Sequence, residues 1–177
     1  MGMFSAIILS PSLGGGGPVP HASEALVRSL SSLVRAAVVG VLRDVTIVGV
    51  AADDLAHIAD HAGCAFVETA DAQAGLAKAL ASTRLPLVFT LEGGYAPLPG
   101  FAEEAGDLAP FIADKGATAM RINPETLLMR LFPDQAPAAG VLASRAALLA
   151  AGGRNLPEIT RRIHARSTMR IRAQRII

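Results

Sequence analysis

Short apolar runs alternate with longer segments of helical periodicity through the first 120 residues. The runs at residues 4–9, 45–50, 65–68 and 86–91 predict buried strands, because they are mostly apolar and bounded by turn-forming residues. Between them, apolar residues such as Leu26, Leu30 and Leu33 recur at helical spacing. The spacing predicts one helix from His21 or Ser23 to about residue 39, a second from residue 53 or 54 to about residue 61, and a third over residues 71–82.

The second half of the chain shows the same alternation less regularly. We expect helices at residues 101–115, 124–132 and 144–151, with a break in the first at Pro110, and a basic helix from Leu156. Strands are expected at residues 117–122 and 140–143. Residues 12–20, rich in Gly and Pro, are expected to form an irregular loop.

This order predicts an α/β fold: a three-layer α/β/α sandwich around a mostly parallel sheet, since its short strands are apolar on both faces. The length of 177 residues suits one domain. Open parallel sheets bind ligands outside the carboxyl ends of their strands. A site is therefore expected from residues 10–20, 49–54 and 92–99.

Composition narrows the class of protein. Apolar residues make up 51% of the chain and charged residues 18%, which excludes a disordered protein. Arginines interrupt every apolar stretch before it reaches the roughly 18 residues of a membrane span, and no secretory signal is recognisable. We expect a cytoplasmic protein, with Cys64, the single cysteine, as a small buried residue. An aromatic content of 4% argues against binding nucleic acid by base stacking.

Charge separates the C-terminal segment from the body. Residues 154–177 hold seven arginines and one acid, a net charge of +6 against +1 for the whole chain, so the preceding residues sum to −5. This divides the chain into an α/β domain at 1–153 and a basic helix or tail at 154–177. The tail is expected to contact an anionic partner, a protein or the inner face of a membrane. A solvated helix face, or pairing with the acidic body, is the alternative.

The loop after the first strand is a candidate phosphate site. Gly14, Gly15 and the two following glycines would let backbone N–H groups approach an anion at the start of a helix. The Lys of a Walker loop and the third glycine of a dinucleotide fingerprint are both missing. A flexible surface loop is the alternative interpretation.

Acidic residues follow three of the predicted elements. Asp53 and Asp54 are candidates for nucleotide or metal contact, or for capping the next helix. Glu92 ends the fourth strand and could reach a ligand or a metal ion, or form part of a turn. Asp134 lies between two prolines, either in a site or at the start of a turn. His57 and His61 have the spacing of a helical metal pair, but the Glu of a zinc-protease motif does not follow His57.

The order of these segments resembles the family 2 glycosyltransferases of the GT-A fold, in their compact bacterial branch. The similarity covers about residues 4–153, including the first strand with Ser10-Pro11, the strand leading to Glu92, and the motif Pro133-Asp134-Gln135. It implies a nucleotide-diphospho-sugar transferase-like fold. The donor would be held by Ser10, Pro11, Gly14, Gly15, Asp53 and Asp54.

The resemblance also implies Mg²⁺ or Mn²⁺ at Glu92, and catalysis by Glu92 and Asp134. The chain departs from the family where glycine replaces the usual acidic and amide residues, at Gly14-Gly15, Gly49 and Gly93-Gly94. We expect these glycines to leave an open cleft without its usual charges, and the nucleotide and metal motifs to be degenerate. Two functions follow: a transferase, with or without a metal ion, or an interaction protein that uses its basic tail.

Overall fold

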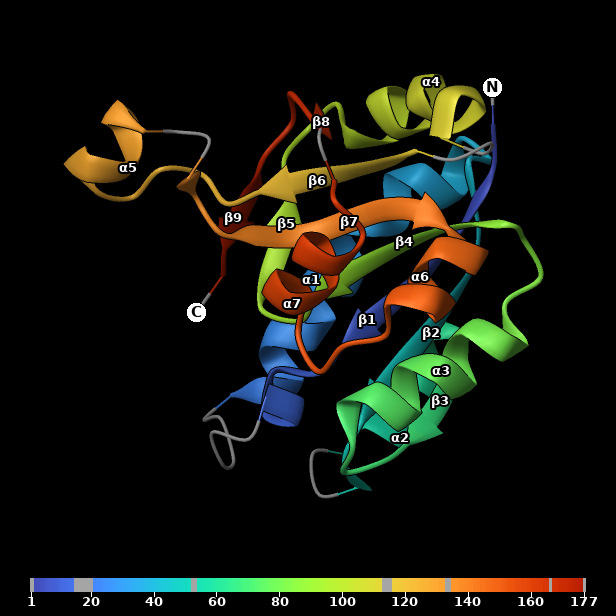
Figure 1. The fold of residues 1–177 in the computed structure, drawn as a ribbon. Coiled ribbons are helices and arrows are strands. Elements are labelled where there is room, and N and C mark those ends of the chain that lie inside the picture. The colour runs from blue at the N-terminus through green and yellow to red at the C-terminus, as the bar shows by residue number, and fades with distance from the viewer. Residues whose placement is uncertain are drawn as a thin grey trace.

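The structure, a computed structural model, describes residues 2–14, 21–51, 54–112, 116–132, 135–165 and 167–176. Its central sheet has seven strands in the order β3-β2-β1-β4-β7-β6-β8 (Figure 1). Only β7 runs against its neighbours, so the sheet is mostly parallel, as predicted. The strands are β1 (Phe4–Leu9), β2 (Leu42–Gly49), β3 (Ala65–Glu68), β4 (Leu87–Glu92), β6 (Ala117–Arg121), β7 (Ala138–Ser144) and β8 (Ser167–Thr168).

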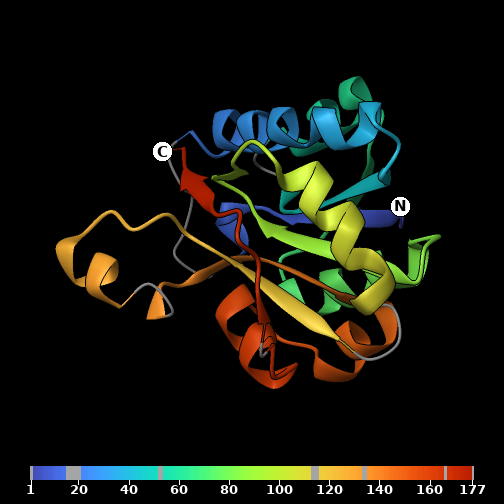
Figure 2. The ribbon, with the colours of Figure 1, turned by 90° about the horizontal axis from the view of Figure 1, so that it is seen from above.

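Helices cover both faces of this sheet, which confirms the predicted three layers. The helices are α1 (Ala22–Val38), α2 (Leu55–Ala62), α3 (Ala72–Ser82), α4 (Phe101–Ile112), α5 (Leu127–Leu131), α6 (Arg145–Ala151) and α7 (Leu156–Arg162). Buried side chains alternate along β1: Phe4 and Ile8 pack in the layer of α1, α2 and α4, whereas Ile7 and Leu9 pack in the layer of α3, α6 and α7. Figure 2 shows α1 and α7 on opposite sides of the sheet.

Local sequence explains several boundaries. Asp71 caps α3 as expected: its Oδ1 accepts hydrogen bonds from the amides of Gln73 at 2.8 Å and Ala74 at 3.2 Å. Gly63 ends α2 in the left-handed conformation, with φ of 66°. Gly140 lies where an added Cβ would meet the Phe89 ring at 2.8 Å, so a glycine on β7 lets that ring pack against the sheet.

Helix α4 continues through Pro110, so the expected break is wrong. Proline has no amide to donate to the carbonyl four residues back, which is that of Gly106. The amide of Gly2 donates to this carbonyl at 3.2 Å. The amide of Gly2 thus replaces the hydrogen bond that the proline removes.

Other differences lie in lengths and in short strands. β2 begins three residues earlier than the expected 45, and β7 extends beyond the expected 140–143 at both ends. α5 is shorter than the expected 124–132. The expected helix from Leu156 ends at Arg162, because the chain then forms β8 and a further strand, β9 (Ala173–Arg175).

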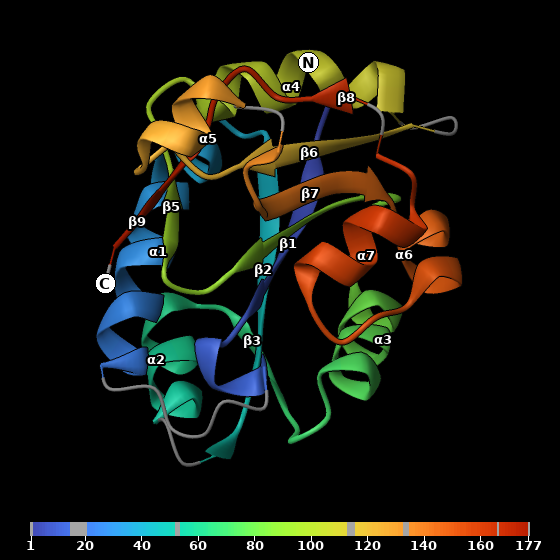
Figure 3. The same cartoon turned by 60° about the vertical axis from the view of Figure 1, so that its left-hand side comes forward.

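β9 forms a second, two-stranded sheet with β5 (Tyr95–Pro97). β5 lies beside α1, and the carbonyl of Ile176, the last described residue, accepts a hydrogen bond from Arg28 of that helix (Figure 3). Helix α5 projects away from the central sheet (Figure 1). Within the described residues, no helix combines the length and the apolar character needed to cross a membrane.

Candidate functional site

The carboxyl ends of three parallel strands meet at one edge of the sheet. Leu9, the last residue of β1, lies opposite Val48 of β2 and Glu92 of β4. The Ser10 amide donates to the Val48 carbonyl at 2.8 Å, and the Gly93 amide donates to the Leu9 carbonyl at 2.7 Å. The structure therefore brings two predicted site residues, Ser10 and Glu92, to the same edge, which we call the carboxyl edge.

A single 3₁₀ turn, η1 (Pro11–Gly14), opens the loop after β1. The Leu13 amide donates to the Ser10 carbonyl at 3.0 Å, and the Ser12 amide donates to Ser10 Oγ at 3.4 Å. Irregular structure was expected from residue 12, but Pro11 has the φ angle that the start of a helical turn requires. Gly14 ends this turn. Gly15, the other glycine of the predicted phosphate site, lies outside the described residues.

Two of the glycines that were expected to leave an open cleft, Gly49 and Gly93, are packed, so this expectation is wrong there. A Cβ at Gly49 would lie 2.1 Å from Leu55 Cδ1 and 3.0 Å from Ser10 Cβ. A Cβ at Gly93 would lie 2.8 Å from Pro11 Cδ and 2.9 Å from the Leu9 carbonyl oxygen. Glycine at these positions allows η1, α2 and the β4–β5 turn to approach one another closely.

Asp54 lies at the start of α2 but does not cap it with its side chain. Its φ of 54° is in the left-handed region, whereas a capping residue is extended so that its side chain can accept from the first free amides. The capping interpretation is therefore wrong for Asp54, whose side chain is exposed. Asp53 and Asp134 lie outside the described residues.

Glu92 is half-buried at the carboxyl edge. Burial raises the pKa of its carboxyl group, and the positive charge of Arg175 acts in the opposite direction. The pKa of Tyr95 is also raised, first by burial and then by the negative charges of Glu92 and Glu125, while Arg175 again lowers it. Glu92, Tyr95, Glu125 and Arg175 thus form an electrostatically coupled group, which we call the edge cluster.

Sequence reasoning found only Glu92 among these four residues. Tyr95 directly follows the glycine turn, and Arg175 belongs to the basic tail, so both lay in segments that had been singled out. Their meeting depends on the pairing of β5 with β9, in which Tyr95 lies opposite Arg175. No short sequence pattern announces a pairing between strands so far apart in the chain.

A divalent ion does not fit the described residues of the edge cluster. Magnesium and manganese are bound by several oxygen ligands, whereas the two carboxylates of this cluster, those of Glu92 and Glu125, share it with the positive charge of Arg175, which opposes a cation. Glu92 is partly desolvated and lies within the field of a guanidinium group. Among the described residues, no group of three or more His, Cys, Asp or Glu side chains is placed to hold a metal ion.

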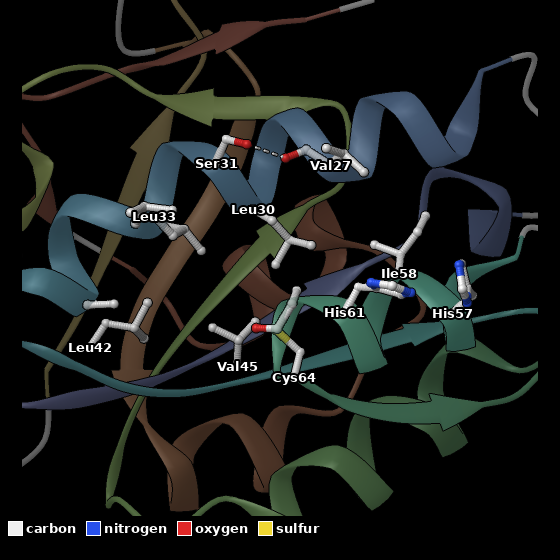
Figure 4. A pocket seen from close by; sticks show the side chains of 13 residues that line it. Val27, Leu30, Ser31, Leu33, Leu42, Val45, His57, Ile58, His61 and Cys64 are labelled. Atoms are coloured by element: carbon white, nitrogen blue, oxygen red, sulfur yellow. Dashed lines mark hydrogen bonds between the residues drawn. The ribbon is translucent and has the colours of Figure 1, made fainter.

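A separate apolar groove of about 510 Å³ lies between α1 and α2 over β2 (Figure 4). His57 and His61 line it, with their rings in edge-to-face contact and their centroids 4.3 Å apart. Cys64 was expected to be buried, but it is half-exposed in this groove. Its partial burial raises the pKa of its thiol. The groove lies on the face of the sheet that α1 and α2 cover, and none of its lining residues belongs to the edge cluster.

Strand order, reversed β7 and helices on both faces define a GT-A-type fold, that of the nucleotide-diphospho-sugar transferases. Two solved structures illustrate the likeness. Glucosyl-3-phosphoglycerate synthase from Mycobacterium tuberculosis, in complex with Mn²⁺, uridine diphosphate and glucosyl-3-phosphoglycerate, matches with a TM-score of 0.59 at 17% identity, over 97% of this chain and 68% of its own. The 4-diphosphocytidyl-2C-methyl-D-erythritol synthase from Anaerococcus prevotii matches with a TM-score of 0.57 at 12% identity, over 95% of this chain and 86% of its own.

At these identities the likeness shows the fold alone. No family model matches the chain. No curated protein sequence matches it either.

Proposed function

We propose that the protein binds a nucleotide sugar at its carboxyl edge and transfers the sugar to an acceptor. The observation that carries this proposal is the convergence of η1, the end of β2 and the β4–β5 turn, with Glu92 at their junction. Ligands of α/β sheets bind at such an edge. A solved protein of the same fold contains uridine diphosphate and Mn²⁺, which supports a nucleoside-diphosphate ligand.

In this proposal, η1 and the start of α2 hold the nucleotide. Ser10 directly precedes η1, Pro11 and Gly14 belong to it, and Asp54 directly precedes α2. Gly15 and Asp53 continue these segments outside the described residues. The requirement for Mg²⁺ or Mn²⁺ is open to experiment, and both ions belong in the binding assay.

Glu92 and Asp134 are the proposed catalytic residues. The acceptor hydroxyl oxygen forms a bond to the anomeric carbon, the bond from that carbon to the diphosphate breaks, and the nucleoside diphosphate leaves. The proton of the hydroxyl passes to the carboxylate of Glu92, for which a raised pKa is favourable. Asp134 is proposed to orient the acceptor.

Isothermal titration tests the proposal most directly. The intact protein is titrated with UDP-, GDP- and CDP-sugars, each with Mn²⁺, with Mg²⁺ and with EDTA. We expect at least one donor to bind with a dissociation constant below a millimolar. Absence of heat for every donor at millimolar concentration would refute the proposed function.

The alternative function is an interaction of residues 154–177 with an anionic membrane or a protein, and it rests on the charge of that segment. In the structure, the amides of Arg170 and Ile171 donate to the Glu104 carboxylate at 2.7 and 2.8 Å. This contact favours pairing of the tail with the acidic body. Co-sedimentation with anionic liposomes at low and high salt tests the alternative, and binding that disappears at high salt would support it.

A further inference from the structure

The C-terminal strand places an arginine beside the carboxyl edge. β9 pairs antiparallel with β5, with Arg175 opposite Tyr95. The amide of Ile176 donates to the carbonyl of Gly94 at 2.9 Å, so the strand continues up to the glycine turn that follows Glu92. Figure 3 shows β9 alongside β5, near the end of the chain.

The side chain of Arg175 projects on the same side as that of Tyr95, because directly opposed residues of an antiparallel pair share a face. Its positive charge acts on both Glu92 and Tyr95. Its side chain is exposed, and among the described residues its guanidinium makes no hydrogen bond or ion pair. This group is therefore available to a ligand at the carboxyl edge.

Neighbouring arginines are engaged elsewhere. Arg28 pairs with Glu24 and also donates to the Ile176 carbonyl at 3.3 Å, which anchors the end of the chain. Arg172 donates to the carbonyl of Ile122 at 3.4 Å. Arg175 is thus distinguished from Arg28 and Arg172 by its lack of these contacts, and from Arg170 by its place on β9 opposite Tyr95.

A nucleoside diphosphate needs positive charge around its phosphates. The described residues do not form a divalent-ion site, whereas a guanidinium group is always charged and its fork of N–H donors matches phosphate oxygens. We propose that Arg175 binds the diphosphate of the donor and supplies the charge that a metal ion would otherwise supply. This inference rests on the proposed function and deepens it: donor binding is independent of divalent ions.

Titration of the intact protein with UDP in EDTA tests this inference, with GDP and CDP as parallel probes. We expect wild-type protein to bind a nucleoside diphosphate without metal, and Arg175→Gln to bind it about ten- to a hundredfold more weakly. Arg175→Lys keeps the positive charge but loses the forked arrangement of N–H donors. Its affinity for the nucleoside diphosphate should therefore lie between those of wild type and Arg175→Gln. Arg170→Gln, an equal change of charge on the same tail, is the matched control and should bind like wild type. The affinity for the corresponding nucleoside should be the same in all four proteins.

Glu92→Gln leaves Arg175 unchanged and distinguishes a diphosphate bound by Arg175 from one bound through a metal ion at Glu92. If Arg175 binds the diphosphate, removal of the neighbouring negative charge strengthens UDP binding in EDTA. If Glu92 holds a metal ion, the same variant weakens binding in Mn²⁺. Circular dichroism and thermal unfolding of each variant show that the fold is retained.

The outcomes distinguish this inference from the proposed function. Binding of UDP, GDP or CDP only in the presence of Mn²⁺ or Mg²⁺, or equal affinities of wild type and Arg175→Gln, would overturn the role of Arg175 and leave the proposed function intact. Absence of binding under every condition would refute both.

Discussion

Replacement of Gly49 by alanine tests whether the carboxyl edge is packed. The new Cβ would lie 2.1 Å from Leu55 Cδ1, whereas carbon atoms in contact are ordinarily about 3.5–4.0 Å apart. Leu55 has no exposed surface, so its side chain cannot turn into solvent. Gly49 does not have a positive φ, and an alanine there meets no backbone strain of its own.

The expected cost follows from these distances. Overpacking of a buried site costs about 1–3 kcal/mol. Alanine also lowers the conformational entropy of the unfolded chain relative to glycine, which offsets about 0.4–1 kcal/mol of this cost. Because the approach to Leu55 is as close as 2.1 Å, we expect the upper half of the overpacking range, so Gly49→Ala should lower the free energy of unfolding by about 1–2.5 kcal/mol and the melting temperature by about 2–10 °C for a chain of this size.

A double-mutant cycle with Leu55→Ala shows whether this cost comes from the contact. Leu55→Ala alone should cost about 2–5 kcal/mol, because it leaves a cavity. In that background only Ser10 Cβ, at 3.0 Å, remains close to the Cβ added at position 49, so Gly49→Ala should cost clearly less than it does in wild type. Urea unfolding followed by circular dichroism gives each free energy, provided that the four m values agree. Additive effects, or an unchanged stability of the single variant Gly49→Ala, would contradict the packed edge.

Three further predictions concern single side chains. Asp71→Ala should lower the free energy of unfolding by about 1 kcal/mol through loss of the α3 cap, with Asp60→Ala on α2 as a control that should change it little. Because the pKa of Glu92 is raised in the folded state, its stabilising contribution is complete below the ordinary value of 4.5 and is lost as the pH rises through the folded-state value. Wild type should therefore lose stability relative to Glu92→Gln as the pH rises in urea titrations, and a constant difference would contradict this. Glu104→Ala should speed hydrogen exchange at Arg170 and Ile171, which donate to its carboxylate, whereas Asp107→Ala on the same helix should not.

The central sheet was predictable because its strands are signalled locally. Residues 4–9 and 65–68 are bounded by breakers and form β1 and β3 with those limits. Asp71 and Gly63 mark helix ends by capping chemistry that depends only on near neighbours. These elements suffice to predict the α/β sandwich and the edge at which its parallel strands end.

The break expected at Pro110 and the cap expected at Asp54 were wrong for a shared reason. Both depend on backbone partners or angles that the rest of the fold supplies. The Gly106 carbonyl accepts a hydrogen bond from the amide of Gly2, which lies far earlier in the sequence. Asp54 adopts a left-handed backbone that no local pattern requires. Local rules state which groups need partners, but tertiary structure decides where those partners come from.

The edge cluster shows the same principle at the site. Its single predicted member, Glu92, suggested a weak metal ligand when it was considered alone. The structure adds Arg175 from the far end of the chain, through the pairing of β9 with β5. Arg175 belongs to the segment that was expected to form a basic tail, and Glu92 to the expected site, and the two thereby lie in one cluster. A positive charge beside Glu92 offers a physical reason why a diphosphate could bind there without the carboxylates that its metal would require.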